Sequence, residues 1–148
     1  MGISRPRSGE HVNAIELVRH FEGCKLVAYP DAGGVQTIGF GHTGPDVYPG
    51  LVWTQIQADT ELQHDLHCAQ VLLLSYSPSV EALPGPLAAL TDFVFNLGIG
   101  SYRTSTLCRD VNAGNWPAAR AQIVLWDHAA GRVLPGLLIR RQAEAALL

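Results

Sequence analysis

The sequence predicts an α+β fold in which a small sheet and a larger group of helices occupy separate parts of the chain. Apolar residues recur at helical spacing at both ends, short β-rich runs lie between them, and the two kinds of segment do not alternate. The 148 residues are 47% hydrophobic, which suffices for one domain with a buried core. We expect a single domain with a sheet lobe at about 24–53, a long helix at about 54–75, and a helical lobe of residues 76–148 plus the N-terminal helix.

The N-terminal helix is predicted over residues 9–21, because apolar residues recur every three positions from Val12 to Phe21. Ser8 is a suitable N-cap, since its hydroxyl can accept a hydrogen bond from a free backbone amide of the first turn. Gly23 suits the left-handed position that often follows a helix. The helix is therefore expected to end just before Gly23.

A β-hairpin is predicted next. Residues 25–29 and 35–40 are rich in β-branched and aromatic side chains, and the segment 30–34 between them contains proline, aspartate and two glycines. Further glycines allow sharp bends after the second strand; they are Gly39, Gly41 and Gly44. Residues 50–53 are expected to add a short third strand.

The remainder of the chain is predicted to be helical. The long helix begins after Thr54, which has capping-box spacing to Gln57, and its length is enough to bridge two lobes. The segment from Pro86 to Leu97 is apolar nearly all round, which predicts a core helix. Shorter helices are expected at about 104–112, 116–127 and 136–147.

Composition and charge exclude several classes of protein. The net charge of −3 disfavours a nucleic-acid binder, although six arginines against three acids in residues 101–148 could face an anionic polymer. No apolar run reaches the roughly 20 residues that a membrane span needs. The first ten residues predict neither a cleavable signal peptide nor a membrane anchor, so we expect the chain to stay in the cytoplasm where it is made. Cys24, Cys68 and Cys108 are expected to be free and mostly buried thiols.

Three polar residues are candidates for a catalytic site. Glu22 lies at the end of the first helix, where the partly negative helix end favours a protonated carboxyl group, as a general acid requires. Asp31 lies at the hairpin turn and Thr37 on the second strand. Each residue also has an ordinary structural explanation. Glu22 could be a solvated surface acid, Asp31 could only bond the amides of the turn, and Thr37 could simply be a residue that favours strands. If the hairpin folds back, however, two carboxyl groups flank a cleft, which is the arrangement that glycoside hydrolysis uses.

Four sequence blocks, which together span about residues 10–148, resemble the signature of phage-type lysozymes, glycoside hydrolase family 24. The first block has three parts around the candidate residues, and the others follow in order: Phe21-Glu22-Gly23, Ala28-Tyr29-Pro30-Asp31 and Gln36 to Gly44; Phe95 to Leu107; Val111 to Gly114; and Leu134 to Glu144. The resemblance implies a lysozyme-like fold with a small sheet lobe and a mainly helical lobe joined by a long helix.

The resemblance also implies a function. Glu22 would protonate the leaving oxygen, Asp31 would activate water on the opposite face of the sugar, and Thr37 would help to position that water, with inversion at the anomeric carbon. The bond cut would be the β-1,4 link between N-acetylmuramic acid and N-acetylglucosamine in bacterial peptidoglycan. We expect an endolysin that needs no cofactor or metal, binds no nucleic acid, does not insert stably into membranes and works as a monomer. It would leave the host cytoplasm through a pore made by another phage protein and then act in the periplasm.

Other polar residues are assigned supporting roles. His42 and Asp65 occupy positions where we expect an ion pair between the sheet lobe and the long helix, although two unpaired polar residues are an equal alternative. Asn96, Arg140 and Arg141 are candidates for binding substrate. Asn96 could instead cap backbone groups, either arginine could touch the catalytic acid, and one of the two arginines is expected to be merely solvated.

Several further residues are interpreted without a catalytic role. His64, His67 and Cys68 have helical spacing that can serve a metal, but a half-exposed helix face is favoured because no fourth ligand is evident. Cys24 is expected to be a buried or half-buried thiol rather than a redox switch. Trp126 is expected to pack in the core rather than stack on a sugar.

Two rival functions use the same residues differently. A peptidoglycan-binding module without activity would be free to lose Glu22. A transglycosylase would keep the acid, but it would not need Asp31 and Thr37 to hold water. Because all three residues are present, the sequence favours a hydrolase.

Overall fold

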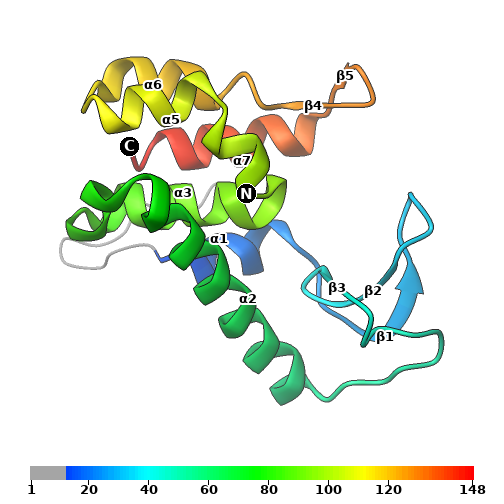
Figure 1. Ribbon diagram of the computed structural model, residues 1–148. Helices are drawn as coiled ribbons and strands as arrows, with labels where there is room; N and C mark the ends of the chain where they lie inside the picture. The colour runs from blue at the N-terminus through cyan, green and yellow to red at the C-terminus, as the bar shows by residue number, and fades with distance from the viewer. Residues whose placement is uncertain (1–12) are drawn as a thin grey trace.

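The computed structural model describes residues 13–148. Figure 1 shows a sheet lobe at the lower right, a larger helical lobe above it, and helix α2 (Gln55–Tyr76) running from one to the other. Helix α1 (Ala14–Phe21) precedes the sheet in the chain and packs against α2 and α3 (Pro84–Leu97) of the helical lobe. The predicted α+β class is therefore confirmed.

Helix α1 begins with a capping box. The side chain of Asn13 accepts a hydrogen bond from the backbone amide of Glu16, and the Glu16 side chain accepts one from the Asn13 amide. Residues 9–12 of the predicted helix and its predicted N-cap, Ser8, lie outside the described residues. At the other end the helix stops at Phe21, as predicted.

The sheet lobe is a three-stranded antiparallel sheet in the order β1 (Lys25–Pro30), β2 (Gln36–Gly39) and β3 (His42–Thr43). The first two strands form the predicted hairpin. The third strand differs from the prediction, because β3 follows directly after the β2 turn. The predicted strand at 50–53 is reduced to a single bridge between Val52 and Val27. Its other residues are held by isolated backbone hydrogen bonds, such as Trp53 N to Leu26 O at 2.8 Å.

The long helix begins as predicted. Thr54 is its N-cap, and Gln57 completes the capping box by accepting from the Thr54 amide at 2.8 Å. Among the described residues, no helix is both long and apolar enough to cross a membrane.

The helical lobe contains the remaining elements in this order: η1 (Pro78–Ala82), α3 (Pro84–Leu97), α4 (Ile99–Arg103), α5 (Thr106–Asn112), α6 (Trp116–Ile123), β4 (His128–Ala129), β5 (Arg132–Val133) and α7 (Pro135–Ala145). Helix α3 begins at Pro84 rather than Pro86, since either proline suits a first turn. Helix α4 and the β4–β5 hairpin were not predicted. The helix predicted at 116–127 stops at Ile123, because the chain turns there toward that hairpin.

Among residues 13–148, the buried apolar side chains form two clusters. One lies inside the helical lobe around Phe93 and Tyr102, and Trp126 packs edge-on against Phe93 with ring centroids 5.5 Å apart, as expected for a core tryptophan. The other joins Phe40 of the sheet lobe to α1 and α2, and Phe95 packs against both clusters. The sheet lobe is thus fixed to the helices on the side away from solvent.

All three cysteines are free, as predicted, but the prediction that they are buried is wrong for two of them. Cys108 is buried, but Cys24 and Cys68 are exposed. Cys24 lies in the link between α1 and β1 beside the side chain of Gln55, and Cys68 lies next to His64 on an open face of α2. Small size favours burial of a thiol, but the helix face and the link on which these two lie are turned toward solvent.

Candidate active site

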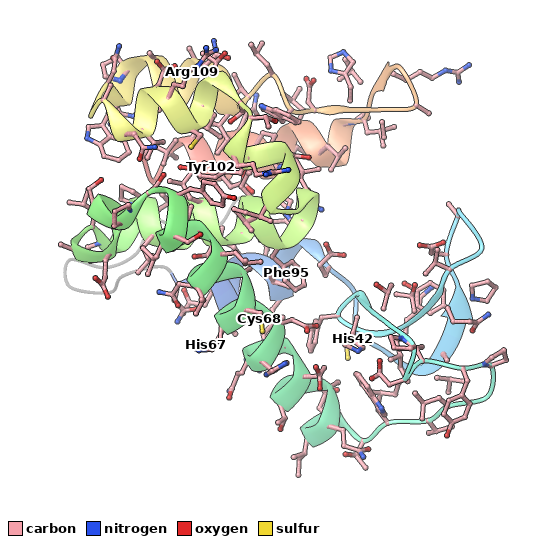
Figure 2. The ribbon with its side chains drawn as sticks, viewed as in Figure 1. His42, His67, Cys68, Phe95, Tyr102 and Arg109 are labelled. Atoms are coloured by element: carbon pink, nitrogen blue, oxygen red, sulfur yellow. The ribbon has the colours of Figure 1, made fainter. Side chains whose placement is uncertain are left out.

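A cleft of about 490 Å³ lies where the sheet lobe meets α2 and the end of α3. Glu22, Asp31 and Thr37 line it, and so do His42, Asp65 and Asn96; the two buried arginines do not. Figure 2 shows His42 on the sheet side of this region, with Cys68 on α2 and Phe95 on α3 facing it. The fold therefore brings the three residues singled out from the sequence into one cavity.

Glu22 is the C-cap of α1, and its backbone amide donates to the carbonyl of Val18 at 2.7 Å. Its side chain is 30% exposed, and Oε1 accepts a hydrogen bond from Arg140 Nη1 at 2.6 Å. The other oxygen, Oε2, faces Gly41, where an added Cβ would come within 3.9 Å of it. One carboxylate oxygen is thus fixed by the protein, while the other, on the Gly41 side, makes no hydrogen bond with the described residues.

Asp31 is held by the turn between β1 and β2. Its Oδ1 accepts hydrogen bonds from the backbone amides of Gly33 at 2.8 Å and Val35 at 2.9 Å. Within residues 13–148, Oδ2 makes no hydrogen bond, and the residue is exposed. The turn role and the catalytic role weighed in the sequence are therefore compatible, because they use different oxygens.

Thr37 lies on β2 and is 4% exposed. Its hydroxyl donates to the carbonyl of Val35 at 2.9 Å, which fixes the direction of its proton. The remaining lone pairs of the hydroxyl can accept a hydrogen bond from a water molecule in the cleft. Asp31 and Thr37 are both tied to Val35, so the hairpin sets their relative position.

Arg140 and Arg141 lie behind the cleft and are 3% and 0% exposed. The expectation that one of them is solvated is wrong. Arg140 binds Asp92 through Nε and Nη2 at 2.9 and 2.7 Å, and Arg141 binds Glu144 at 2.7 Å and Asn96 at 3.0 Å, all through side chains. Burial removes both arginines from the cleft surface. Of the three candidates for binding substrate, only Asn96 lines the cleft.

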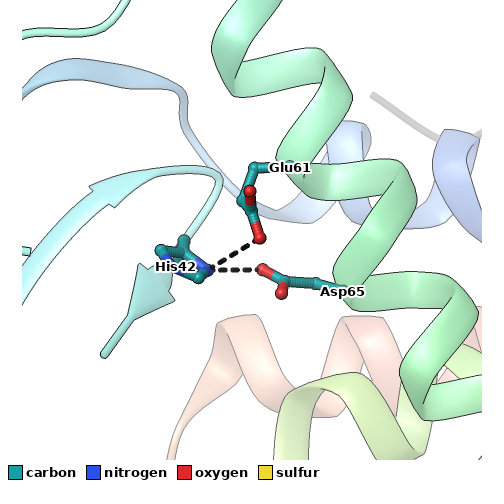
Figure 3. Close-up of side chains that lie close together, drawn as sticks. All are labelled: His42, Glu61 and Asp65. Atoms are coloured by element: carbon teal, nitrogen blue, oxygen red, sulfur yellow. Dashed lines mark hydrogen bonds and ion pairs between the residues drawn. The ribbon is translucent and has the colours of Figure 1, made fainter. Parts of the chain in front are cut away.

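The contact expected between His42 and Asp65 is present. Nδ1 of His42 lies 2.8 Å from Asp65 Oδ2 and 3.7 Å from Glu61 Oε1, and Nε2 lies 3.1 Å from Asp46 Oδ2. Dashed lines mark the contacts with Asp65 and Glu61 in Figure 3. Burial lowers the pKa of His42, but the hydrogen bonds and charges of Asp65 and Asp46 outweigh burial and raise it above its usual value. The ion pair ties β3 to α2 at the cleft wall.

Within residues 13–148, one group of three side chains has the spacing to hold a metal ion. His42, Glu61 and Asp65 each offer one ligand atom, and these atoms lie within 4.8 Å of one another. In the structure these atoms serve the ion pairs described above. Further along α2, His64 Nε2 and Cys68 Sγ are 3.7 Å apart and both residues are exposed.

Four acidic residues near the site were not identified from the sequence; they are Asp46, Glu61, Asp92 and Glu144. Asp92 was missed because it is a single acid within the apolar sequence of α3. Glu144 stands three residues after Arg141, a helical spacing that could have indicated a pair. Asp46 packs where Gly44 leaves room, since a Cβ on Gly44 would lie 2.6 Å from Asp46 Oδ1.

The sequence model of the phage lysozyme family matches residues 19–144. The chain is 37% identical over 123 residues to the SAR-endolysin of Bacteriophage PS119, which covers 83% of this chain and 73% of that protein. It is 39% identical over 136 residues to the endolysin of Acyrthosiphon pisum secondary endosymbiont phage 1, which covers 88% and 91% of the two chains.

A solved structure agrees with these relatives. The muramidase domain of SpmX from Asticaccaulis excentricus superposes with a TM-score of 0.81 at 30% identity, over 90% of this chain and 92% of that one. The matched family model spans well over half of the chain, and both lobes and the cleft lie within it. The chain therefore belongs to the phage lysozyme family, and it is a glycoside hydrolase of the lysozyme type.

Proposed function

We propose that this enzyme hydrolyses the β-1,4 bond between N-acetylmuramic acid and N-acetylglucosamine in bacterial peptidoglycan, with inversion at the anomeric carbon. The observation that carries the proposal is that Glu22, Asp31 and Thr37 line one cleft, with an oxygen of each carboxyl group left free of protein hydrogen bonds among the described residues. Glu22 Oε2 protonates the leaving glycosidic oxygen. Asp31 Oδ2 takes a proton from the attacking water.

Thr37 positions that water. Its hydroxyl donates its hydrogen bond to the Val35 carbonyl and therefore accepts one from the water. The other hydrogen of the water then points toward Asp31. Asn96 lies across the cleft on α3 and offers an amide group to the sugar substituents. The sheet lobe thus supplies the base and the water contact, whereas α1 supplies the acid.

The test compares the wild-type enzyme with Glu22→Gln on purified Gram-negative peptidoglycan. New reducing ends and hydrated product masses are expected from the wild type, and a loss of at least about 100-fold is expected for the variant, because general acid catalysis contributes that much. Proton NMR of the first products on a soluble chitooligosaccharide should show the α-anomer before mutarotation. Anhydromuramic products would identify a transglycosylase instead, and binding to the wall without any sugar release would identify a binding module.

We further propose that the enzyme acts as a monomeric endolysin, which passes from the host cytoplasm to the periplasm through a pore made by another phage protein. Two of its relatives carry the names endolysin and SAR-endolysin, and the fold is shared over nearly the whole chain. Expression in Escherichia coli with and without a pore-forming phage protein tests the release route. We expect lysis only when both proteins are made, and rapid lysis by the enzyme alone would contradict the proposal.

A further inference from the structure

A cluster of buried charged side chains lies between α3 and α7, directly behind the cleft. Asp92 of α3 and Arg140, Arg141 and Glu144 of α7 are at most 3% exposed. Arg140 donates twice to Asp92, at 2.9 and 2.7 Å, and once to Glu22 at 2.6 Å, while Arg141 donates to Glu144 Oε1 at 2.7 Å. Such a dry cluster is costly unless its charges balance and its polar atoms find partners.

The charges of this cluster do not balance when all its members are ionised. Among the described residues it contains two guanidinium groups and three carboxyl groups, including that of Glu22, so one negative charge is in excess while Glu22 is ionised. Water can reach Glu22, but it cannot reach Asp92 or Glu144. Among the described residues Glu144 Oε2 has no donor, although Asp92 lies within hydrogen-bond reach of this carboxyl group. One proton between the two acids would supply the missing donor, whatever the charge on Glu22.

The contacts decide which acid carries that proton. Both oxygens of Asp92 already accept hydrogen bonds from Arg140, and this bidentate pairing favours the ionised form of Asp92. Glu144 accepts one hydrogen bond, from Arg141. Burial, reinforced by the neighbouring Asp92, raises the pKa of Glu144 well above its usual range.

We propose that Glu144 is a neutral carboxylic acid that donates a hydrogen bond to Asp92, and that this acid pair holds Arg140 against Oε1 of Glu22. Neither Asp92 nor Glu144 lines the cleft, so both are positioning residues. Their role rests on the proposed function of Glu22 as the general acid. The protonation of Glu144 does not depend on that proposed function, because it follows from the buried contacts alone.

The pairing has a consequence for Glu22. A lone guanidinium beside a carboxyl group favours the carboxylate and so weakens a general acid. Here Asp92 neutralises Arg140 through two hydrogen bonds, so Glu22 faces an ion pair instead of a lone cation. Arg140 can then fix Oε1 while Oε2 stays free, on the Gly41 side of the cleft, to carry the proton.

The proton on Glu144 is tested directly by carbon-13 NMR of protein labelled at the glutamate side-chain carboxyl carbons, with Glu144→Gln used to assign the signal. We expect one resonance to keep the position of a protonated acid at about pH 7, where an ordinary glutamate, with a pKa of about 4.3, is ionised. That resonance should be missing in Glu144→Gln. If every glutamate resonance has reached its carboxylate position at that pH, the proposal is overturned, whatever the enzyme's activity.

The positioning role is tested by kinetics on soluble glycan fragments. Glu144→Ala should lower kcat by about 10- to 100-fold with KM nearly unchanged, the loss that a small displacement of a catalytic group causes. Glu144→Gln should recover most of that loss, because its amide can donate to Asp92 and accept from Arg141. Asp92→Asn should move the alkaline limb of kcat/KM to lower pH by about one unit or more, since Arg140 is then left to Glu22 alone.

Two results would overturn the positioning role. One is a Glu144→Gln enzyme as impaired as Glu144→Ala, which would mean that the site needs a charge at position 144. The other is an Asp92→Asn enzyme with an unmoved pH profile. Failure of the proposed function gives a different pattern, namely full activity in Glu22→Gln with the NMR signal of Glu144 unchanged. If Asp92→Asn does not fold, the rescue by Glu144→Gln and the NMR titration still decide the matter.

Discussion

Asp65→Asn removes the charge that ties α2 to β3 through His42. The two side chains are 26% and 14% exposed, and their contact of 2.8 Å is the shortest that His42 makes with the three surrounding acids. Asparagine has nearly the same shape as aspartate, so the substitution changes charge and hydrogen bonding with little change in packing. The second partner of the imidazole, Asp46, remains in place.

The magnitude follows from this geometry. A hydrogen bond to a charged group contributes about 1.5–3 kcal/mol. The partial exposure of Asp65 and the retained contact with Asp46 put the expected loss near the lower end, at about 1.5 kcal/mol. In a protein of about this size each kcal/mol lowers Tm by about 2–4 °C, so Tm should fall by about 3–6 °C at a pH where His42 is charged.

The sign of the pH dependence follows from the raised pKa of His42. A group whose pKa is higher in the folded protein contributes its full stabilisation below the unfolded value, about 6.5 for histidine, and loses it as the pH rises through the folded value. The ion pair is therefore fully present at about pH 5.5. Its contribution fades once His42 loses its proton, so the wild type and Asp65→Asn should differ least at about pH 9.

Thermal unfolding followed by circular dichroism at both pH values measures this difference. Asp59→Asn is the matched control, because Asp59 lies on the same helix, α2, and forms an exposed pair with Arg19 of α1 at 3.0 Å. The two side chains are 34% and 49% exposed. The control should lose less than about 1 kcal/mol, and equally at both pH values, since arginine does not titrate there. An Asp65→Asn deficit as large at pH 9 as at pH 5.5 would refute the reasoning. The reasoning would also be refuted if His42 titrated at the same pH in Asp65→Asn as in the wild type, as followed by NMR.

Three further substitutions test the catalytic residues and the packing. Asp31→Asn keeps an oxygen for the two turn amides, so kcat should fall at least about 100-fold while Tm changes by less than about 3 °C; an active variant would remove Asp31 from the mechanism. Thr37→Val removes a buried hydroxyl and should lower stability by about 1 kcal/mol but kcat by more than tenfold (about 1.4 kcal/mol), as activity assays and urea unfolding can compare. Gly85→Ala should lower stability by about 1–3 kcal/mol, because its Cβ would lie 2.6 Å from the carbonyl oxygen of Leu147. Gly136→Ala, which meets nothing within 4 Å, is its control and should be neutral or stabilising.

The elements that sequence predicted well are those that local chemistry specifies. Helix α2 has a capping box and a long run at helical spacing, and the β1–β2 hairpin has β-branched strands around a turn with two glycines. Strand β3 and the β4–β5 hairpin have two residues in each strand, too few for any periodicity, and they exist because tertiary contacts hold them. The short helix α4 was missed for a similar reason, since glycines flank its start.

The proposed catalytic residues of the candidate site were predictable because they stand at a fixed spacing within the first 37 positions. Glu22, Asp31 and Thr37 form such a set, and the structure places them in one cleft, although their catalytic roles remain proposals. The burial of Arg140 was not predictable, because its partner Asp92 is 48 positions away in an apolar helix. Local pattern favours solvent for an arginine, and only long-range pairing reverses that preference.

The turn between β2 and β3 connects the catalytic residues with the contact between the lobes. Gly39 has a φ of +66°, and a Cβ there would lie 3.0 Å from the ring of Trp53. Trp53 in turn packs against the cluster beneath the sheet and lies beside the His42 ring, with centroids 5.5 Å apart. Thr37 precedes this turn and His42 follows it, so the strand that carries Thr37 is held in place by the ion pair on α2. Stability of the lobe contact and geometry of the water site are therefore properties of the same few residues, and a change in one is expected to alter the other.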